Sequence, residues 1–335
     1  MMDEIVTPDE LQILLNLADE VRISYPLYRG DLLAALPEGA RYRIEMTASR
    51  EDYHAWLLQF GEIADELPSY SDLLECMLAS GIIRYANQEA FDEMLQTYRR
   101  LKKDVYFGLD TNVLYHRFVS TNPHISPSSC ILVNTVSDEI AFAVNRRYSA
   151  QKIAEITAYA PEQAAIIGEL ENKRTKKSRK AAYLAMREYR AIRDRAIEIT
   201  APAAHSHRRE ENDLTIVRAL RAFEDERYAL PVLLTADTYM ADICDAEGLE
   251  YFLFERPYEI RVTSCRAGEF VRLLFNLAAV FGVVRCNDVH IFGEYGGKGS
   301  SLEDLKLRFS GGGLHEAFGR ELKICRRLTA LGIER

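Results

Sequence analysis

The sequence lacks the features that mark a membrane-spanning or secreted chain. It contains no run of about 18 uncharged apolar residues, so no segment is expected to cross a membrane. The first ten residues, MMDEIVTPDE, are acidic and show no basic region followed by an apolar stretch, so no signal peptide is expected. We therefore expect a cytoplasmic protein without a membrane partner.

Closely spaced cysteines are also lacking. No C-x-x-C pair occurs, which argues against a structural zinc site and against a disulfide framework. Scattered single cysteines suit a reducing cytoplasm. The six cysteines are Cys76, Cys130, Cys244, Cys265, Cys286 and Cys325.

Two nucleotide-binding patterns are absent. The Gly-rich segment GEYGGKGS (residues 293–300) does not have the Walker spacing, because Gly299 instead of Ser or Thr follows Lys298. A flexible hairpin turn is the expected structure there. The aromatic pattern of RNA-recognition strands is absent as well, so specific base stacking is not predicted.

Acidic residues are concentrated in the first third of the chain. The net charge of −9 conceals 20 acidic and 10 basic residues in 1–104, 22 and 20 in 105–258, and 9 and 12 in 259–335. A length of 335 residues favours two or three domains. We take these three segments as the expected domains.

Residues 1–104 are expected to form a helical accessory region. Thr7, Pro8 and Glu10 have the spacing of a helix start before LQILLNLADEV. Helical patterns follow over residues 51–67, 71–79 and 88–103. No chemical motif occurs in this region, so an accessory or oligomerising role is expected, and homo-oligomer formation stays open.

Residues 105–258 alternate between short apolar runs and helical patterns. The runs VYFGLD, CILVNTV, PVLLTAD and EYFLF predict a parallel sheet with helices on both faces, which is an α/β fold. Ligands of such sheets collect at the carboxyl ends of the strands. Residues 259–335, with a helix over 267–281, two strand-like runs and a final helix, predict a small α+β appendage.

Four acidic residues lie at strand ends or helix starts of the central segment. Asp110 ends the first strand and Asp237 ends PVLLTAD. Glu139 lies in the first turn of a helix expected to open at Ser137, and Asp213 lies near the start of another. Carboxylates gathered at one sheet rim repel one another unless they bind a cation or share protons. Mg²⁺ and Mn²⁺ prefer such oxygen ligands.

Alternatives stay open at each position. A single Asp at a strand end or helix start is commonly a cap or turn residue. Asp138 competes with Glu139 for the second position. Asp242, one turn beyond Asp237, is an outside candidate ligand or a solvated helix residue.

The ordered segments FGLDTNVLYHRF, NTVSDEIAFAV, NDLTIVRAL and LLTADTYMADICDAEGL resemble the PIN-domain nuclease family (PilT N-terminus, VapC-like). The resemblance covers about residues 105–256 and implies a PIN-like, Rossmann-like parallel sheet. It departs from compact members through long flanks and 73 residues between the second and third acidic positions. By this resemblance four residues are catalytic and metal-binding and two support them by hydrogen bonds: Asp110, Glu139, Asp213 and Asp237, with Asn112 and Thr235.

The resemblance implies a metal-dependent hydrolase that cleaves phosphodiester bonds, with an endoribonuclease preferred and Mg²⁺ or Mn²⁺ as cofactor. RNA is favoured over DNA as partner. A non-cleaving nucleic-acid-binding scaffold of the same fold and a structure-specific DNA nuclease are the alternatives.

A basic helical insertion is expected at about residues 150–205. Residues 171–195 carry ten Lys or Arg and three Asp or Glu, and an apolar stripe predicts a helix that packs on one side and presents positive charge on the other. Phosphate contacts from such side chains dominate sequence-independent nucleic-acid affinity. A solvated surface helix is the alternative. The predicted nucleic-acid-binding residues are Lys173, Arg174, Lys176, Lys177, Arg179, Lys180, Arg187 and Arg190.

Overall fold

The computed structural model describes residues 2–201, 209–294 and 303–333. Contacts divide the chain into two units. Unit 1 comprises Met1–Cys76, Arg147–Lys176 and Ile260–Arg335, and unit 2 comprises Met77–Arg146 and Lys177–Glu259. These units differ from the three consecutive segments expected from the sequence, because segments distant along the chain share one sheet.

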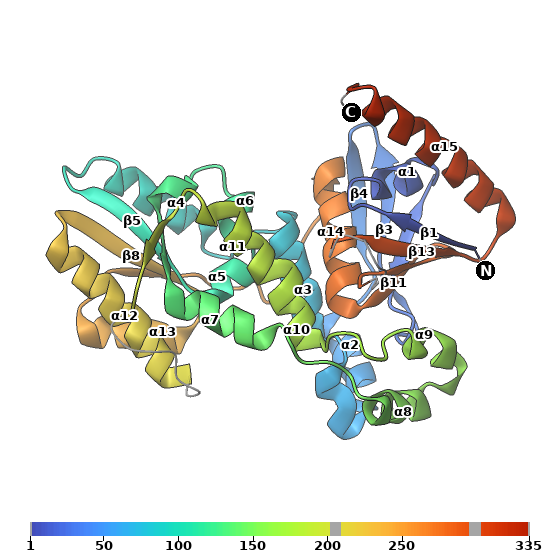
Figure 1. The fold of residues 1–335 in the computed structure, drawn as a ribbon, viewed down its shortest axis with the longest axis horizontal. Coiled ribbons are helices and arrows are strands. Elements are labelled where there is room, and N and C mark those ends of the chain that lie inside the picture. The colour runs from blue at the N-terminus through green and yellow to red at the C-terminus, as the bar shows by residue number, and fades with distance from the viewer. Residues whose placement is uncertain (1, 202–208, 295–302, 334–335) are drawn as a thin grey trace. The chain divides into compact units, whose positions relative to one another are not determined.

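Unit 1 contains an eight-stranded antiparallel sheet with the order β1-β13-β12-β11-β2-β3-β4-β10 (Figure 1). Strands from both ends of the chain alternate in it: β1 pairs with β13, and β2 pairs with β11. The strands are β1 (Met2–Val6), β2 (Val21–Ser24), β3 (Asp31–Glu38), β4 (Arg41–Met46), β10 (Ser264–Arg266), β11 (Val283–Cys286), β12 (Val289–Phe292) and β13 (Leu305–Phe309).

The expectation of a helical N-terminal region is wrong for residues 2–46, which hold four strands. β3 and β4 form a hairpin around Gly39, whose φ of +65° suits a residue without a side chain. The helix start predicted at Thr7 is displaced: Thr7 N donates to Glu10 Oε2 at 2.9 Å within a turn, and the N-cap of the helix is Glu10. The helix α1 that follows covers only Leu11–Asn16, so a strong start signal did not predict a long helix.

Helices pack against the sheet of unit 1. The longest apolar one, α14 (Ala267–Phe281), is buried along most of its length and contacts β4, β10, β11 and β12. α15 (Gly312–Ala330) packs against β13 and α1. The other helical segments are α2 (Arg50–Leu58), η1 (Gly61–Glu66), α8 (Ala150–Tyr159), η3 (Pro161–Gln163) and α9 (Ala164–Gly168), and α3 (Tyr70–Ser80) continues into unit 2.

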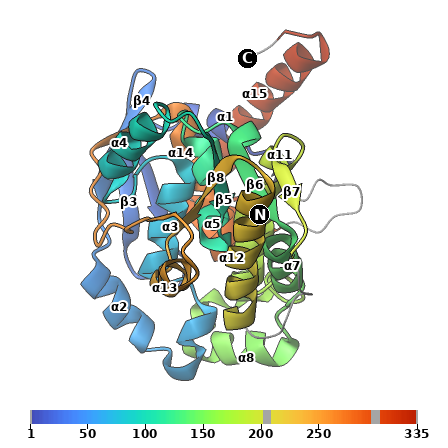
Figure 2. The ribbon, with the colours of Figure 1, turned by 90° about the vertical axis from the view of Figure 1, so that its left-hand side faces the viewer.

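Unit 2 contains a five-stranded parallel sheet with the order β7-β6-β5-β8-β9. Figure 2 shows β5, β6 and β8 among the helices of this unit. The strands are β5 (Asp104–Leu109), β6 (Cys130–Val133), β7 (Ile197–Ile199), β8 (Ala229–Thr235) and β9 (Tyr251–Leu253). The helices are α4 (Gln88–Tyr98), α5 (Thr111–Tyr115), α6 (Phe118–Thr121), η2 (Pro127–Ser129), α7 (Asn134–Ala143), α10 (Lys176–Lys180), a π-helical turn (Ala181–Ala185), α11 (Met186–Arg193), α12 (Arg209–Glu226) and α13 (Thr238–Glu247).

Helices cover both faces of this parallel sheet, as the alternating pattern predicted. On one face Tyr106 of β5 packs against Phe223 of α12. On the other face Phe107 of β5 contacts Phe91 of α4, which is fully buried. Successive strand residues point to opposite faces, so one strand contacts both layers. The mixed α/β fold is confirmed, and α4 explains why unit 2 begins before residue 105.

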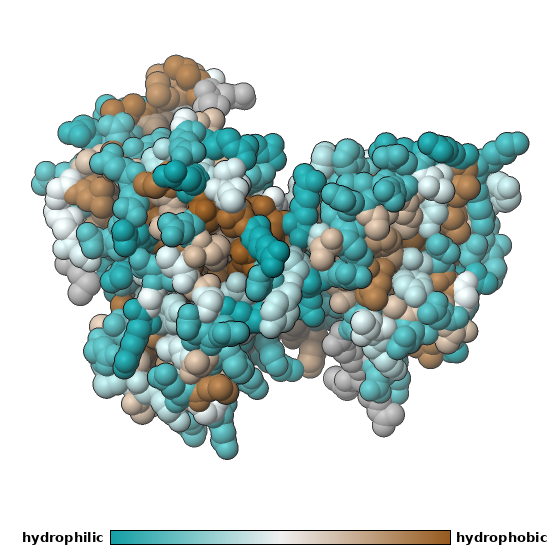
Figure 3. All heavy atoms as spheres, turned by 180° about the vertical axis from the view of Figure 1, so that it is seen from behind, coloured by the Kyte–Doolittle hydropathy of each residue, from teal (hydrophilic) through white to brown (hydrophobic). Residues whose placement is uncertain are grey.

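None of the described helices is long and apolar enough to cross a membrane. Hydrophilic side chains cover most of the molecular face drawn in Figure 3, with hydrophobic ones in smaller patches. Most of the Gly-rich turn expected over residues 293–300, and the end of the expected insertion (202–205), lie outside the described residues.

Candidate functional site

The strand order of the parallel sheet changes direction between β5 and β8, which makes this position the topological switch point. From β5 it proceeds to β6 and β7 on one side, and β8 and β9 then extend the sheet on the other side. Ligands of open α/β sheets bind outside the carboxyl ends of the strands at this switch point. Asp110 directly follows β5, and Asp237 lies two residues beyond β8.

Asp110 is the buried carboxylate of the switch point. Only 4 % of this residue is exposed. Its Oδ2 atom accepts hydrogen bonds from Thr235 Oγ1 at 2.8 Å and from Asn112 Nδ2 at 3.1 Å. Burial raises the pKa of Asp110 and the charge of Glu139 raises it further, while the Thr235 and Asn112 hydrogen bonds lower it. Burial therefore disfavours the charged form of Asp110, and two side-chain donors partly offset this effect.

Glu139 is the second carboxylate of the site. It lies in the middle of α7, which begins at Asn134 and not at Ser137 as expected. Thr111 Oγ1 donates to Glu139 Oε2 at 2.7 Å, and Asn212 Nδ2 donates to Oε1 at 3.3 Å. Each oxygen thus has a donor, and Glu139 connects α5, α7 and α12.

Of the two neighbours that competed in the sequence, Glu139 is in contact with the site. Asp138 is exposed and Glu139 is half-buried. Asp242, the outside candidate, is exposed on α13. These positions favour Glu139 as the acidic residue of α7.

Asp237 and Asp213 are the other two predicted acidic residues, and their structural environments differ. Asp237 is the N-cap of α13, where its Oδ1 accepts a hydrogen bond from Tyr239 N at 3.0 Å, and its own N–H donates to Thr235 Oγ1 at 3.0 Å. Asp213 is buried on α12, next to Asn212. Thr235 therefore links Asp110 to the backbone of Asp237 across the switch point.

The four carboxylates do not form one assembled cluster. Among residues 2–201, 209–294 and 303–333, no three His, Cys, Asp or Glu side chains gather closely enough to hold a metal ion. Glu139 and Asp237 are instead held by hydroxyl, amide or backbone donors.

Asp110 and Glu139 together still have the chemistry of a magnesium or manganese site. Mg²⁺ commonly uses one or two protein carboxylates and keeps several waters. Asp110 is the N-cap of α5 and Glu139 lies on the neighbouring α7. Both offer only oxygen, and they lie close enough for the charge of Glu139 to raise the pKa of Asp110. The carboxylates of Asp110 and Glu139 therefore fit such an ion as a pair of ligands. Asp213 and Asp237 are the further ligands predicted from the sequence.

No model of a known protein family matches this chain, and no curated protein is similar to it in sequence. The resemblance to PIN-domain nucleases thus depends on the four quoted segments. The activity that it implies stays a proposal.

The basic residues do not lie on one exposed helix face. Lys173 and Arg174 precede α10, and the helical part is interrupted by a π-helical turn and ends at Arg193. Arg179 is 1 % exposed and is among the largest fully buried side chains. The expectation of outward-facing charge is wrong for this residue.

Two further members of the set are engaged inside unit 1. Arg174 Nη1 lies 2.6 Å from Glu294 Oε1, and both side chains are mostly buried. Lys176 Nζ donates to Leu67 O at 2.7 Å and lies 3.4 Å from Asp72. Helical periodicity predicted that Lys176 lies off the apolar stripe, but it could not show which distant acids Lys176 and Arg174 contact.

Lys173 is half-buried and belongs to unit 1, and the four remaining cationic residues belong to unit 2. Lys177 and Arg190 are exposed, whereas Lys180 and Arg187 are half-buried. Of the predicted basic surface, only Lys177 and Arg190 are exposed among the described residues.

Thr111 and Asn212 were not among the predicted supporting residues. Both donate to Glu139. Each directly follows or precedes a predicted acidic residue in the sequence, as Asp110-Thr111 and Asn212-Asp213, and this adjacency is the signal that identifies them.

Proposed function

We propose that unit 2 is a divalent-metal-dependent nuclease, most readily an endoribonuclease, whose reaction takes place at the carboxyl edge of its parallel sheet. One observation carries the proposal: a buried carboxylate, Asp110, lies at the switch point beside a second one, Glu139, with a hydroxyl donor on each. A desolvated anion is costly unless its environment compensates. A cation bound between the two carboxylates supplies that compensation.

Asp110 and Glu139 would hold the ion. When bound, such an ion activates water at neutral pH and stabilises negative charge on phosphorus oxygens. Thr235 and Asn112 orient Asp110, and Thr111 and Asn212 orient Glu139 (contacts given above). The supporting donors fix the carboxylate rotamers, so less reorganisation is needed when substrate arrives.

Lys177 and Arg190 support a nucleic-acid substrate, because both are exposed cations on unit 2. Contacts from two such side chains are independent of sequence and weaken with salt. RNA as the preferred substrate comes from the family resemblance.

The test is a cleavage assay with single- and double-stranded RNA and DNA in Mn²⁺, Mg²⁺ or EDTA. We expect metal-dependent cleavage that Asp110→Asn reduces at least about 100-fold and Thr235→Val reduces about 10–100-fold. The matched control is Asp225→Asn, an exposed acid on α12, which should cleave as wild type. Cleavage by Asp110→Asn at the wild-type rate would refute the assignment.

A non-cleaving scaffold is the second candidate, favoured by the lack of three clustered acids among the described residues. Nucleic-acid binding that survives in Mn²⁺ without any cleavage, and is unchanged in Asp110→Asn, would support the scaffold. It would exclude the nuclease.

A further inference from the structure

A row of directly opposed residues crosses five neighbouring strands of the unit 1 sheet. Ser24 of β2 is opposite Arg285 of β11, which is opposite His290 of β12. His290 is opposite Arg308 of β13, which is opposite Asp3 of β1. Opposed residues of antiparallel strands lie on the same face, and like charges there are destabilising. This row therefore brings three basic side chains together on one face.

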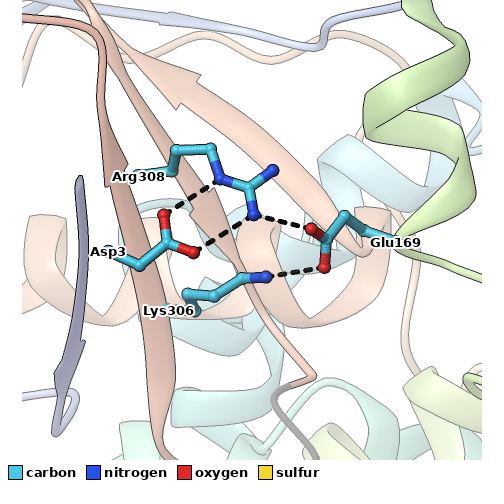
Figure 4. A network of polar contacts seen from close by, with 4 residues as sticks. All are labelled: Asp3, Glu169, Lys306 and Arg308. Carbon is cyan, nitrogen blue, oxygen red and sulfur yellow. Dashed lines mark hydrogen bonds and ion pairs between the residues drawn. The ribbon is translucent and has the colours of Figure 1, made fainter. Parts of the chain in front are cut away.

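One end of the row is neutralised within the protein. Figure 4 shows the Arg308 guanidinium between Asp3 and Glu169. Its Nε lies 3.0 Å from Asp3 Oδ1, and its Nη2 lies 2.6 Å from Glu169 Oε1. Glu169 also pairs with Lys306 at 2.6 Å. Hydrogen bonding to Asp3 and Glu169 raises the pKa of Arg308, so the charge of Arg308 is used in ion pairs within the protein.

The other end of the row opens into a pocket. Arg285 donates from Nε to Ser24 Oγ at 3.1 Å. In the part of the chain that the structure describes, no carboxylate lies within ion-pair distance of Arg285 or of Arg29, a second cation in the same pocket. His290 also lines it, and burial together with Arg285 and Arg308 lowers the pKa of His290. The pocket thus has an excess of positive potential.

Aromatic rings form much of the remaining wall. The pocket has a volume of about 480 Å³, within the range of small-molecule sites. Trp56 is 7 % exposed and is held by a hydrogen bond from Nε1 to Leu27 O at 2.9 Å. Tyr28 contacts Trp56 edge-on, and Tyr159, which is 54 % exposed, lies against Phe60. Such rings offer flat surfaces on which a base can stack.

We propose that this pocket of unit 1 binds a nucleoside 5′-monophosphate, free or as the terminal nucleotide of a strand. The phosphate would lie on Arg285 and Arg29, because a guanidinium recognises phosphate through paired hydrogen bonds. The base would stack on the aromatic wall. Glu162, the one acid among the described lining residues, offers an acceptor for a ribose hydroxyl or a base amino group. The site lies in unit 1 and does not depend on the proposed nuclease.

Trp56 is the single tryptophan of the chain, so its fluorescence reports this pocket alone. We would titrate the full chain in EDTA with AMP, UMP, adenosine, inorganic phosphate and a 5′-phosphorylated oligonucleotide. Calorimetry would measure affinity, and Trp56 fluorescence would locate the ligand. EDTA prevents phosphate from binding through a metal at unit 2.

We expect saturable AMP binding that changes Trp56 fluorescence, with adenosine and phosphate each at least about tenfold weaker. Arg285→Gln should weaken AMP at least about tenfold, because a charged hydrogen bond is lost. Tyr159→Ala removes a largely exposed ring and should weaken binding without unfolding. Arg43→Gln, on an exposed β4 arginine, is the matched control and should bind as wild type.

Comparison of AMP with the oligonucleotide distinguishes a free nucleotide from a strand end. Equal affinity of wild type and Arg285→Gln, with thermal melting showing both folded, would overturn the proposal. So would calorimetric binding without any change in Trp56 fluorescence, or a lack of binding by every ligand.

Discussion

Replacing Asp110 by Asn should stabilise unit 2 in the absence of metal while removing its response to metal. The carboxylate is buried, and its pKa is raised by burial and by Glu139. Asn keeps an oxygen that can accept from Thr235 and Asn112. The substitution therefore removes a buried ionisable group and keeps both side-chain hydrogen bonds. Active-site carboxylates commonly trade stability for function in this way.

The expected gain is about 0.5–2 kcal/mol in the free energy of unfolding, the usual range for single stabilising substitutions. About 1 kcal/mol raises the Tm of a domain of this size by roughly 2–4 °C. Mn²⁺ at about 100 times its Kd should add about 2.7 kcal/mol to wild type and none to the variant. Thermal unfolding followed by circular dichroism, in EDTA and in Mn²⁺, measures both effects.

The difference between the two proteins should depend on pH. Because the folded pKa of Asp110 lies above its ordinary value of 3.8, the folded state keeps this proton where the unfolded chain has released it. The stability linked to Asp110 is present at low pH and is lost as pH rises through the folded pKa. Asp110→Asn should gain least near pH 3.8 and most at neutral pH. A variant less stable than wild type in EDTA at neutral pH, or equally stabilised by Mn²⁺, refutes this reasoning.

Four further predictions concern the packing of both units. Gly108→Ala should cost about 1–3 kcal/mol, measured by urea unfolding, because its Cβ would lie 2.5 Å from Leu220 Cδ1, and Leu220→Val in the same chain should recover part of the loss. Gly293→Ala should cost more and broaden the unfolding transition of unit 1, because its Cβ would lie 2.1 Å from a backbone carbonyl oxygen of α14 that cannot yield. Tyr85→Phe should cost about 1–3 kcal/mol, because the hydroxyl 2.5 Å from His116 Nδ1 is the partner of a buried nitrogen. Burial lowers the pKa of His116 from 6.5 to about 3, so folding stability linked to it is lost as pH falls through that window, and His116→Gln should flatten the pH dependence there.

The parallel sheet could be predicted because its strands are continuous apolar runs. Strands β5, β6, β8 and β9 were each expected within a few residues, since a strand buried on both faces shows a signal of its own. β7 covers only Ile197–Ile199 and lies within the insertion that was expected to be helical, because two isoleucines two residues apart carry little periodicity.

The antiparallel sheet of unit 1 was not predicted, because its strands come from both ends of the chain. β1 pairs with β13, more than 290 residues away along the chain. Such pairing leaves no local spacing in the sequence. The hairpin of β3 and β4 does have a local signal at Gly39, but the helical expectation for residues 1–104 depended on the helix start at Thr7 and on the helical patterns after residue 50.

The sequence predicted where the candidate site lies in the fold better than it predicted which side chains contact one another there. Asp110 lies at the strand end where the sequence placed it, and Thr235 donates to it across the switch point. Burial of Arg179 and the pairing of Arg174 with Glu294 were not predictable, because helical spacing shows the face of a charge and not its partner.

Anomalous diffraction from crystals soaked in Mn²⁺ tests the central claim most directly. The account predicts a manganese peak with an oxygen of Asp110 and an oxygen of Glu139 both within about 2.0–2.3 Å, the bond length of such ions to carboxylates. Crystals of Asp110→Asn should lack the peak. At saturating Mn²⁺, a peak on other side chains only, or the same peak in Asp110→Asn, would contradict the account.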